Sequence, residues 1–288
     1  MDRRAALRHL LEEENADAML VSSPSHVRWL TGFSGSSGLV LAHGGNCILV
    51  TDGRYATQAR DEADVSEVRI ADADLLDHVL DNGILKAGAT LLVQPEHLTG
   101  SQLEKIRSRR SADGLVLKEG TFQQAMARKE QFEIDAIRRA LSISEQVFSY
   151  LIDWIVPGMR EFEIAAEIVY QHLRRGAQRM SFDPIVASGP NSAMPHARPT
   201  DREIEPSDIL LMDFGCVWEG YASDLTRTVA IGEAPDRLRQ VYDIVLEAQE
   251  SAIAGARGGI RARDLVAMAR RRIDAACFKD HFPHSLGH

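Results

Sequence analysis

Residues 209–231 read ILLMDFGCVWEGYASDLTRTVAI. Two apolar, β-prone runs flank a Trp-Glu-Gly turn at 218–220, a pattern typical of a β-hairpin. Asp213 belongs to the first predicted strand and Asp224 to the second. Because their midpoint falls at the turn, we expect the two carboxylates to lie nearly opposite each other.

These two carboxylates predict a metal site. Like charges this close repel strongly when apolar neighbours such as Leu211, Met212 and Phe214 exclude water. A shared proton neutralises them in part, and a divalent metal ion does so more completely. The alternative is an acidic pair on a solvated face of the hairpin, which is common, so the metal hypothesis needs support from other residues.

The composition indicates two folded domains and excludes a nucleic-acid partner. The 288 residues are 44% hydrophobic, enough for each of two domains to bury its own core. The net charge is −9, and the basic run Arg270–Arg272 lies in a helical pattern typical of a solvated helix face.

The chain carries neither a membrane-spanning pattern nor a signal-peptide pattern. No apolar run reaches transmembrane length, and residues 1–20 show the pattern of an amphipathic helix with acidic residues. Cys47, Cys216 and Cys277 are far apart in sequence, as is typical of reduced, buried cysteines. We therefore expect a cytoplasmic protein without a membrane partner.

The first 120 residues alternate between predicted strands and helices, which favours an α/β layer domain. Helices are expected at 2–15, 73–80 and 100–108, with further short helices after Ser25 and Asp52. The expected strands are 18–22, 38–42, 47–51, 68–70, 90–93 and 115–117.

From Phe122 onward the pattern becomes helical. A long helix is expected up to Pro157, then a second helix and a loop-rich stretch at 182–208 that leads to the hairpin. Helices at 237–256 and 262–277 follow, so helix, break and helix occur twice. The first copy continues into strands, whereas the second stops at His288; we therefore expect a fragment of a longer chain.

Three histidines add possible chemistry. His284 and His288 form an H-x-x-x-H pair, but the intervening Pro, Ser and Gly favour a loop or strand start over a helix. His196 lies in a proline-bounded loop. A neutral imidazole can ligate a metal, donate a hydrogen bond to an oxyanion or carry a proton. Each of these histidines alone is more often incidental or solvated.

Taken together, these segments resemble the Xaa-Pro aminopeptidase and prolidase family. The strings SGPNSAMPHARPTDR at 188–202, LLMDFGCVWEGYASDLTRTVAIG at 210–232 and FPHSLGH at 282–288 carry the resemblance. SSPSHVRWLTGFSGSSG at 22–38 and TDGRY at 51–55 resemble the creatinase-type N-terminal domain of the same proteins. The resemblance implies a creatinase-like α/β domain at 1–120, then a pita-bread α+β metallopeptidase domain at 121–288 that is incomplete at its C-terminus.

The resemblance also implies a dinuclear metal site that hydrolyses the bond before a penultimate proline. Asp213 matches an aspartate that chelates one metal, Asp224 one that bridges both, and His288 a histidine on the other metal. Oxygen-rich ligation suits a hard ion, so Mn²⁺ is expected first, with Co²⁺ or Zn²⁺ as alternatives. His196 resembles the histidine that hydrogen-bonds the substrate, and His284 one that lines the substrate pocket.

Here the chain departs from the family pattern. The family uses two further glutamate ligands that follow the His288 motif, and Glu219, Glu233 and Glu247 lie in the wrong places to replace them. We therefore expect the 288-residue chain itself to be metal-poor and inactive, and the intact gene product to be the enzyme.

Other readings stay open. A prolidase restricted to Xaa-Pro dipeptides is a close alternative to an aminopeptidase, and a non-catalytic pita-bread module that binds peptides is a more distant one. A creatinase-like hydrolase needs no metal, and the presence of Asp213 and Asp224 disfavours it. The resemblance implies a homodimer, to which Trp29, Leu30 and Phe33 contribute unless they pack into the N-terminal core.

Overall fold

The computed structural model describes residues 3–81, 83–86, 88–282 and 286. The chain forms two compact units, Met1–Ala136 and Ile137–His288. The division falls inside helix α7, Gln131–Trp154, rather than at residue 120, and the boundary expected from the sequence stays a prediction. Each unit is described separately below.

The first unit is built on a six-stranded mixed sheet in the order β4-β3-β2-β1-β5-β6. The pairs β1–β2 and β2–β3 are antiparallel, whereas β3–β4, β1–β5 and β5–β6 are parallel. The strands are β1 Ala18–Val21, β2 Leu39–His43, β3 Asn46–Asp52, β4 Glu67–Ala71, β5 Leu91–Val93 and β6 Leu115–Leu117.

Apolar cores cover both faces of this sheet, because alternate side chains of each strand point to opposite sides. On β1, Met19 and Val21 join one core cluster, and Ala18 and Leu20 join the other. The helices are α1 Arg3–Glu13, α2 Pro24–Thr31, α3 Ala56–Glu62, α4 Leu75–Asp81, α5 Gly100–Arg109 and α6 Gln123–Ala127. The α/β layer domain predicted from the sequence is confirmed.

The structure places Trp29, Leu30 and Phe33 in the core of the first unit, which was the alternative to a contact in a homodimer. They are only 6%, 5% and 1% exposed and belong to the core cluster that also holds Leu7 and Val40. Their side chains therefore stabilise the first unit from within.

The second unit contains the three-stranded antiparallel sheet β12-β9-β8. Its strands are β8 Ile185–Ser188, β9 Ile209–Phe214 and β12 Leu225–Ala230. The short strand β8 lies inside the stretch expected to be loop, so that part of the expectation was wrong. Four residues between Pro184 and Gly189 give too brief a pattern to separate strand from loop.

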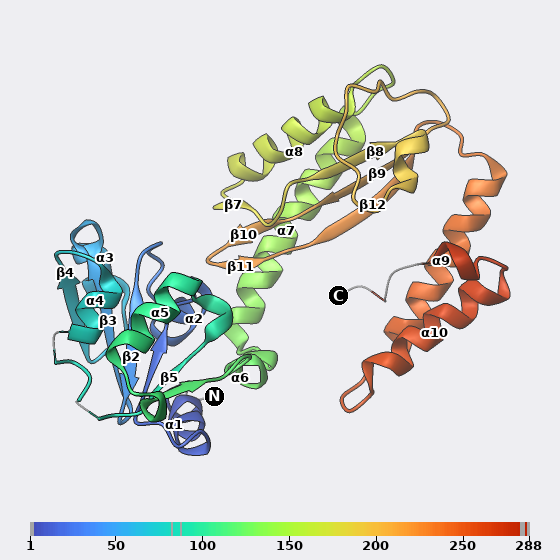
Figure 1. Ribbon diagram of the computed structural model, residues 1–288. Helices are drawn as coiled ribbons and strands as arrows, with labels where there is room; N and C mark the ends of the chain where they lie inside the picture. The colour runs from blue at the N-terminus through green and yellow to red at the C-terminus, as the bar shows by residue number, and fades with distance from the viewer. Residues whose placement is uncertain (1–2, 82, 87, 283–285, 287–288) are drawn as a thin grey trace. The chain divides into compact units, whose positions relative to one another are not determined.

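Helices α7, Gln131–Trp154, and α8, Glu161–Arg174, pack against one face of this sheet (Figure 1). Their apolar residues form one core cluster with the inward-facing side chains of β9, which are Leu210, Met212 and Phe214. The alternate residues of β9 are less buried and face away from these helices. The long helix expected over 127–156 is confirmed as α7.

The hairpin continues beyond β9 and β12 into a second small sheet, β11-β10-β7. Its strands are β7 Arg179–Met180, β10 Cys216–Trp218 and β11 Tyr221–Ala222. Trp218 pairs directly with Tyr221, so the turn contains only Glu219 and Gly220. Both have positive φ, 47° and 80°, which is the backbone that a type I′ turn requires.

Helices α9, Asp236–Gly255, and α10, Ala262–Ala275, follow the hairpin and pack on each other through Ala248, Ala252, Ala269 and Ile273. Gly258 and Gly259 lie in the turn between them, as the sequence predicted. Among the residues that the structure describes, no helix is long and apolar enough to cross a membrane.

Candidate active site

Asp213 lies on the face of β9 that points away from α7 and α8. Its strand neighbours Met212 and Phe214 are fully buried in the core, whereas Asp213 is half-buried on the opposite face. Its register partners are Thr226 on β12 and Ile185 on β8. The Thr226 hydroxyl donates a hydrogen bond of 2.9 Å to Asp213 Oδ1, which fixes one carboxylate oxygen on this face.

Asp224 does not lie opposite Asp213, and the expectation from the sequence was wrong by two residues. The observed register pairs Asp213 with Thr226, and its continuation pairs Asp224 with Gly215. The cause is the position of the turn: pairing Asp213 with Asp224 would centre the turn between Trp218 and Glu219, whereas the observed turn is centred between Glu219 and Gly220, and a one-residue shift of the centre moves the register by two. Asp213 and Asp224 are diagonal neighbours, a separation at which a single ion can still lie between two carboxylates.

Gly215 allows the two halves of the hairpin to approach closely beside Asp224. A Cβ atom at residue 215 would lie 1.9 Å from the Ser223 carbonyl oxygen and 3.1 Å from Asp224 Cα. Because these are backbone atoms of the paired strand, no side-chain rotation relieves the contact. The position therefore requires glycine, and it holds the Asp224 backbone against the strand that carries Asp213.

A buried chain of hydrogen bonds anchors the residue before Asp224. The Cys216 N–H donates to Ser223 Oγ at 3.0 Å, and Ser223 Oγ lies 2.9 Å from Ser144 Oγ. Ser144 Oγ lies 3.2 Å from His172 Nε2, and His172 Nδ1 lies 2.8 Å from the Ile168 carbonyl oxygen. The carbonyl can only accept, so Nδ1 carries the hydrogen and Nε2 accepts from the serine.

The neutral form of His172 is the one that completes this chain. The histidine is fully buried. Burial lowers its pKa, and the hydrogen bond to Ile168 offsets that effect only in part. A neutral His172 lets every hydroxyl in the chain donate once, so Ser223 is held in one orientation next to Asp224.

His196 is exposed on the loop that joins β8 to β9. The loop opens with the short 3-10 helix η4, Gly189–Ala193, and its backbone hydrogen bonds include one from Ala197 N–H to the Met194 carbonyl. An exposed imidazole on such a loop is accessible to a ligand, and its position depends on how the two ends of the loop are held.

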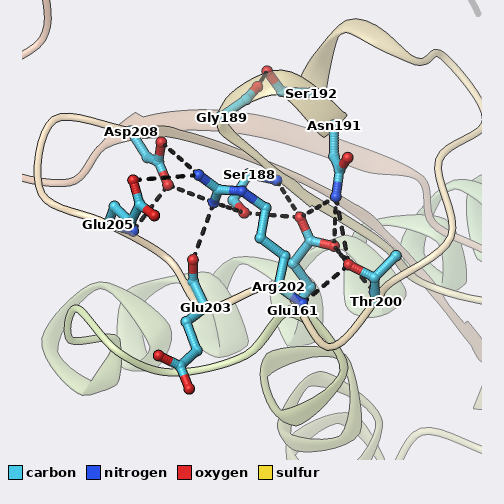
Figure 2. Close-up of polar contacts among 10 residues, drawn as sticks. All are labelled: Glu161, Ser188, Gly189, Asn191, Ser192, Thr200, Arg202, Glu203, Glu205 and Asp208. Carbon is cyan, nitrogen blue, oxygen red and sulfur yellow. Dashed lines mark hydrogen bonds and ion pairs between the residues drawn. The ribbon is translucent and has the colours of Figure 1, made fainter.

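Both ends of this loop are held by Glu161, the first residue of α8 (Figure 2). Its fully buried carboxylate accepts hydrogen bonds from the backbone and hydroxyl of Ser188 at 2.7 and 2.8 Å, and from those of Thr200 at 3.0 and 2.7 Å. The Asn191 amide contributes bonds of 3.1 and 3.2 Å. Burial alone favours the protonated acid, but these donors outweigh it and hold the pKa of Glu161 below its ordinary value.

Arg202 and Asp208 extend the same network. Arg202 Nη1 donates to Ser188 Oγ and to Asp208 Oδ2, each at 2.6 Å, and Nη2 donates to Asp208 Oδ1 at 3.2 Å. The hydrogen bond to Asp208 raises the pKa of the Arg202 guanidinium. Gly189 lies against this pair, since a Cβ there would lie 2.6 Å from Asp208 Oδ1.

The sequence reading did not identify Glu161 or its partners as site residues. Ser188, Asn191, Thr200 and Arg202 all lie within the 188–202 string that carries the family resemblance, so a signal for them was present. The sequence gives no signal that singles out Glu161, because Glu163 in the same helical turn has the same side chain and cannot be distinguished from it by pattern.

The expected ligand set is only partly covered by the structure. His284 and His288 lie outside the described residues. Within the described part of the chain, no group of three or more His, Cys, Asp or Glu side chains is placed to hold a metal ion. Asp213 and Asp224 fit part of such a site, because they are diagonal neighbours on the hairpin and their carboxylates provide the hard oxygen donors that such ions prefer.

Comparison with known proteins identifies the family. Metallopeptidase family M24 matches residues 135–288, and the Creatinase/Prolidase N-terminal domain matches residues 3–125. The chain belongs to metallopeptidase family M24. This M24 chain is 30% identical to the Xaa-Pro dipeptidase of Pyrococcus furiosus over 288 residues, which cover 100% of this chain and 81% of that protein.

Solved structures agree with this M24 assignment. The Xaa-Pro dipeptidase from Bacillus anthracis matches with a TM-score of 0.94 at 31% identity, covering 100% of this chain and 81% of that one. The X-Pro aminopeptidase from Thermotoga maritima matches with a TM-score of 0.86 at 32% identity, covering 94% and 79%. The predicted fold class, a creatinase-like α/β domain followed by a pita-bread α+β domain, is confirmed.

Membership in M24 also defines the general chemistry. A metallopeptidase hydrolyses peptide bonds with the help of divalent metal ions, so the resemblance found in the sequence is confirmed at this level.

Proposed function

We propose that this M24 peptidase cleaves peptides before a proline in the second position. We also propose that it uses a pair of divalent metal ions, for which Mn²⁺ is the first choice. The observation that carries the proposal is the placement of Asp213 and Asp224 as diagonal neighbours on one hairpin. Relatives named as Xaa-Pro dipeptidases and aminopeptidases support the choice of substrate.

In this proposal the side chains of Asp213, Asp224 and His288 would hold the two metal ions. Bound there, the ions polarise the scissile carbonyl and lower the pKa of water. The chain holds its ligands in place beforehand: Thr226 fixes one oxygen of Asp213, and Gly215 keeps the Asp224 backbone against the opposite strand.

His196 and His284 contribute to substrate binding in the same proposal. The exposed His196 imidazole donates a hydrogen bond to the substrate carbonyl and to the oxyanion that develops as water attacks. His284 lines the pocket for the substrate. Removing one such donor typically lowers kcat by about a hundredfold or more.

A prolidase restricted to dipeptides is the second candidate, because several relatives carry that name. The two candidates differ in the substrate length that they accept. The homodimer and the cytoplasmic compartment are proposed with either activity, and light scattering and cell fractionation test them.

The deciding experiment measures cleavage of an Xaa-Pro dipeptide and of a longer Xaa-Pro peptide with Mn²⁺, Co²⁺ or Zn²⁺ added. Two samples are compared: the 288-residue chain, and the natural protein purified from the cells that produce it. The intact mass of each is measured before the assay. Cleavage of both substrates before proline supports an aminopeptidase, and cleavage of the dipeptide alone supports a prolidase.

Variants connect that activity to the aspartates. Asp213→Asn and Asp224→Asn each abolish cleavage in the proposal, whereas Asp274→Asn, an exposed aspartate on α10, leaves it unchanged. Binding of Xaa-Pro peptides without any turnover by the host-cell protein would instead favour the non-catalytic module. Metal analysis separately tests the prediction that the 288-residue chain is metal-poor and inactive.

A further inference from the structure

We propose that Glu161 is a positioning residue for His196, which it places through the two ends of the loop that carries this histidine. The inference rests on the proposed role of His196 in substrate binding. Glu161 itself lies on α8, outside the loop and outside the expected ligand set.

The first argument is the saturation of a buried charge. The Glu161 side chain is 0% exposed, and its two oxygens share five donor groups: two from Ser188, two from Thr200 and the Asn191 amide. Removing a carboxylate from water costs free energy that only such a full set of hydrogen bonds offsets. A glutamate used merely to start a helix does not need five partners from another segment.

The second argument is the location of these partners. Ser188 is the last residue of β8, and Thr200 lies twelve positions later, so Glu161 bonds to both ends of the loop 189–199 (Figure 2). One oxygen, Oε1, binds the Ser188 end, and the other, Oε2, binds the Thr200 end. A single rigid carboxylate therefore sets the distance between the two ends.

The third argument is the backbone at the start of α8. The N–H of Glu161 donates to the Arg202 carbonyl at 3.1 Å, and the N–H of Phe162 donates to the Thr200 carbonyl at 3.1 Å. Amides that are unsatisfied at a helix start thus bind the far end of the same loop. The start of α8 therefore holds the loop through both the Glu161 side chain and the backbone N–H groups of Glu161 and Phe162.

The loop ends are also fixed to the sheet that carries Asp213. Ser188 pairs with Leu210 and Ile185 with Asp213, so the β8 end of the loop moves only with β9. Arg202 bonds to Ser188 Oγ. The position of His196 relative to the aspartates therefore depends on the Glu161 carboxylate, since that carboxylate joins the two ends of the loop on which His196 lies.

The test compares Glu161→Gln with Glu163→Gln. Glu163 lies two residues away on the same helix, is exposed, and accepts a hydrogen bond of 2.8 Å from the Arg160 N–H in the capping box of α8. Both variants remove one carboxylate from the same turn, but only the first faces the loop. A glutamine amide at 161 turns one acceptor into a donor that opposes the donors of Ser188 or Thr200.

Two readouts need no catalysis: amide hydrogen exchange along 188–202 and the imidazole NMR signals of His196. In Glu161→Gln we expect exchange at Ser188 and Thr200 to rise about tenfold or more, and the His196 signals to move toward those of an unstructured peptide. Exchange in the β9 core at Met212 stays as in the parent. Unchanged His196 signals, or an equal rise in the core, would overturn the proposal.

A second pair of variants covers the case in which Glu161→Gln does not fold. Thr200→Val keeps the shape and removes one hydroxyl donor, whereas Thr200→Ser retains that donor. We expect the valine variant to alter the His196 signals and the serine variant to restore them. Equal behaviour of the two overturns the inference.

Activity is measured in parallel on metal-loaded protein purified from its host cell. Glu161→Gln is expected to lower kcat for an Xaa-Pro peptide with little change in KM, while Glu163→Gln matches the parent. If the parent does not cleave such peptides, the proposed function fails, and the exchange and NMR readouts still decide the role of Glu161.

Discussion

The Thr226 hydroxyl donates a 2.9 Å hydrogen bond to Asp213 Oδ1 across the β9–β12 pair. Asp224 is the diagonal neighbour of Asp213 in the same register. A hydroxyl that orients a ligand oxygen lowers the entropy lost when a cation binds, so the threonine belongs to the function proposed for the aspartates.

Thr226→Val is therefore expected to weaken Mn²⁺ binding by about tenfold, because groups that orient metal ligands typically contribute 10- to 100-fold. Titration of the protein followed by EPR of free Mn²⁺ measures the affinity. Thr228→Val is the matched control, since Thr228 faces Leu211 from the same side of β12. Equal affinities of the two variants would contradict the role assigned to Thr226.

Gly215→Ala is expected to destabilise the second unit by about 3 kcal/mol. The added Cβ would lie 1.9 Å from the Ser223 carbonyl oxygen, and the paired strands must separate to admit it. Urea unfolding followed by tryptophan fluorescence measures the change. Gly258→Ala serves as the control because a Cβ there meets no atom within 4 Å. A Gly215→Ala protein as stable as this control would mean that the hairpin is not as closely paired as described.

Glu219→Asn is expected to stabilise the hairpin by about 1 kcal/mol. Glu219 has a φ of 47°, a left-handed backbone that asparagine adopts at lower cost, and Asn-Gly is a favoured type I′ pair. The same unfolding assay applies. Glu233→Asn removes an equal charge from an exposed residue without positive φ and controls for electrostatics. No gain over that control would show that the turn strain is negligible.

The sequence predicted the hairpin correctly because its two apolar runs and the turn residues all favour the same structure. It misplaced the register by two residues, because it centred the turn between Trp218 and Glu219, whereas the observed turn is centred between Glu219 and Gly220 and requires positive φ at Glu219. Glu219 is a non-glycine residue in a left-handed conformation, which the local sequence disfavours. The position of the turn therefore becomes visible only from the pairing of Trp218 with Tyr221.

Part of the candidate site could be predicted because the residue types alone indicate the chemistry. Asp213 and Asp224 carry charge within an apolar pattern, which is visible without a structure. Glu161 could not be found this way, because its importance comes from burial beneath a loop that begins 27 residues later at Ser188. Helical periodicity does not distinguish it from Glu163, and the contacts that do are tertiary.

The buried His172 predicts how the stability of the second unit depends on pH. Its pKa in the folded protein is lowered from 6.5 by burial, so below about pH 6.5 the unfolded chain binds a proton that the folded chain excludes. Stability is therefore complete above pH 6.5 and falls as the pH drops toward the folded-state pKa, with a limiting slope of about 1.4 kcal/mol per pH unit.

His172→Gln removes this titration while its amide oxygen still accepts from Ser144, so its stability is expected to change less between about pH 5 and pH 6.5. His196→Gln makes the same exchange at an exposed histidine of the same unit and is the matched control. Urea unfolding of the three proteins at each pH gives the comparison. Parallel curves for parent and His172→Gln would mean that folding does not lower the pKa of His172, because a protonated Nε2 can donate to Ser144 at no cost. The hydrogen-bonded chain to Ser223 would then not depend on the neutral imidazole.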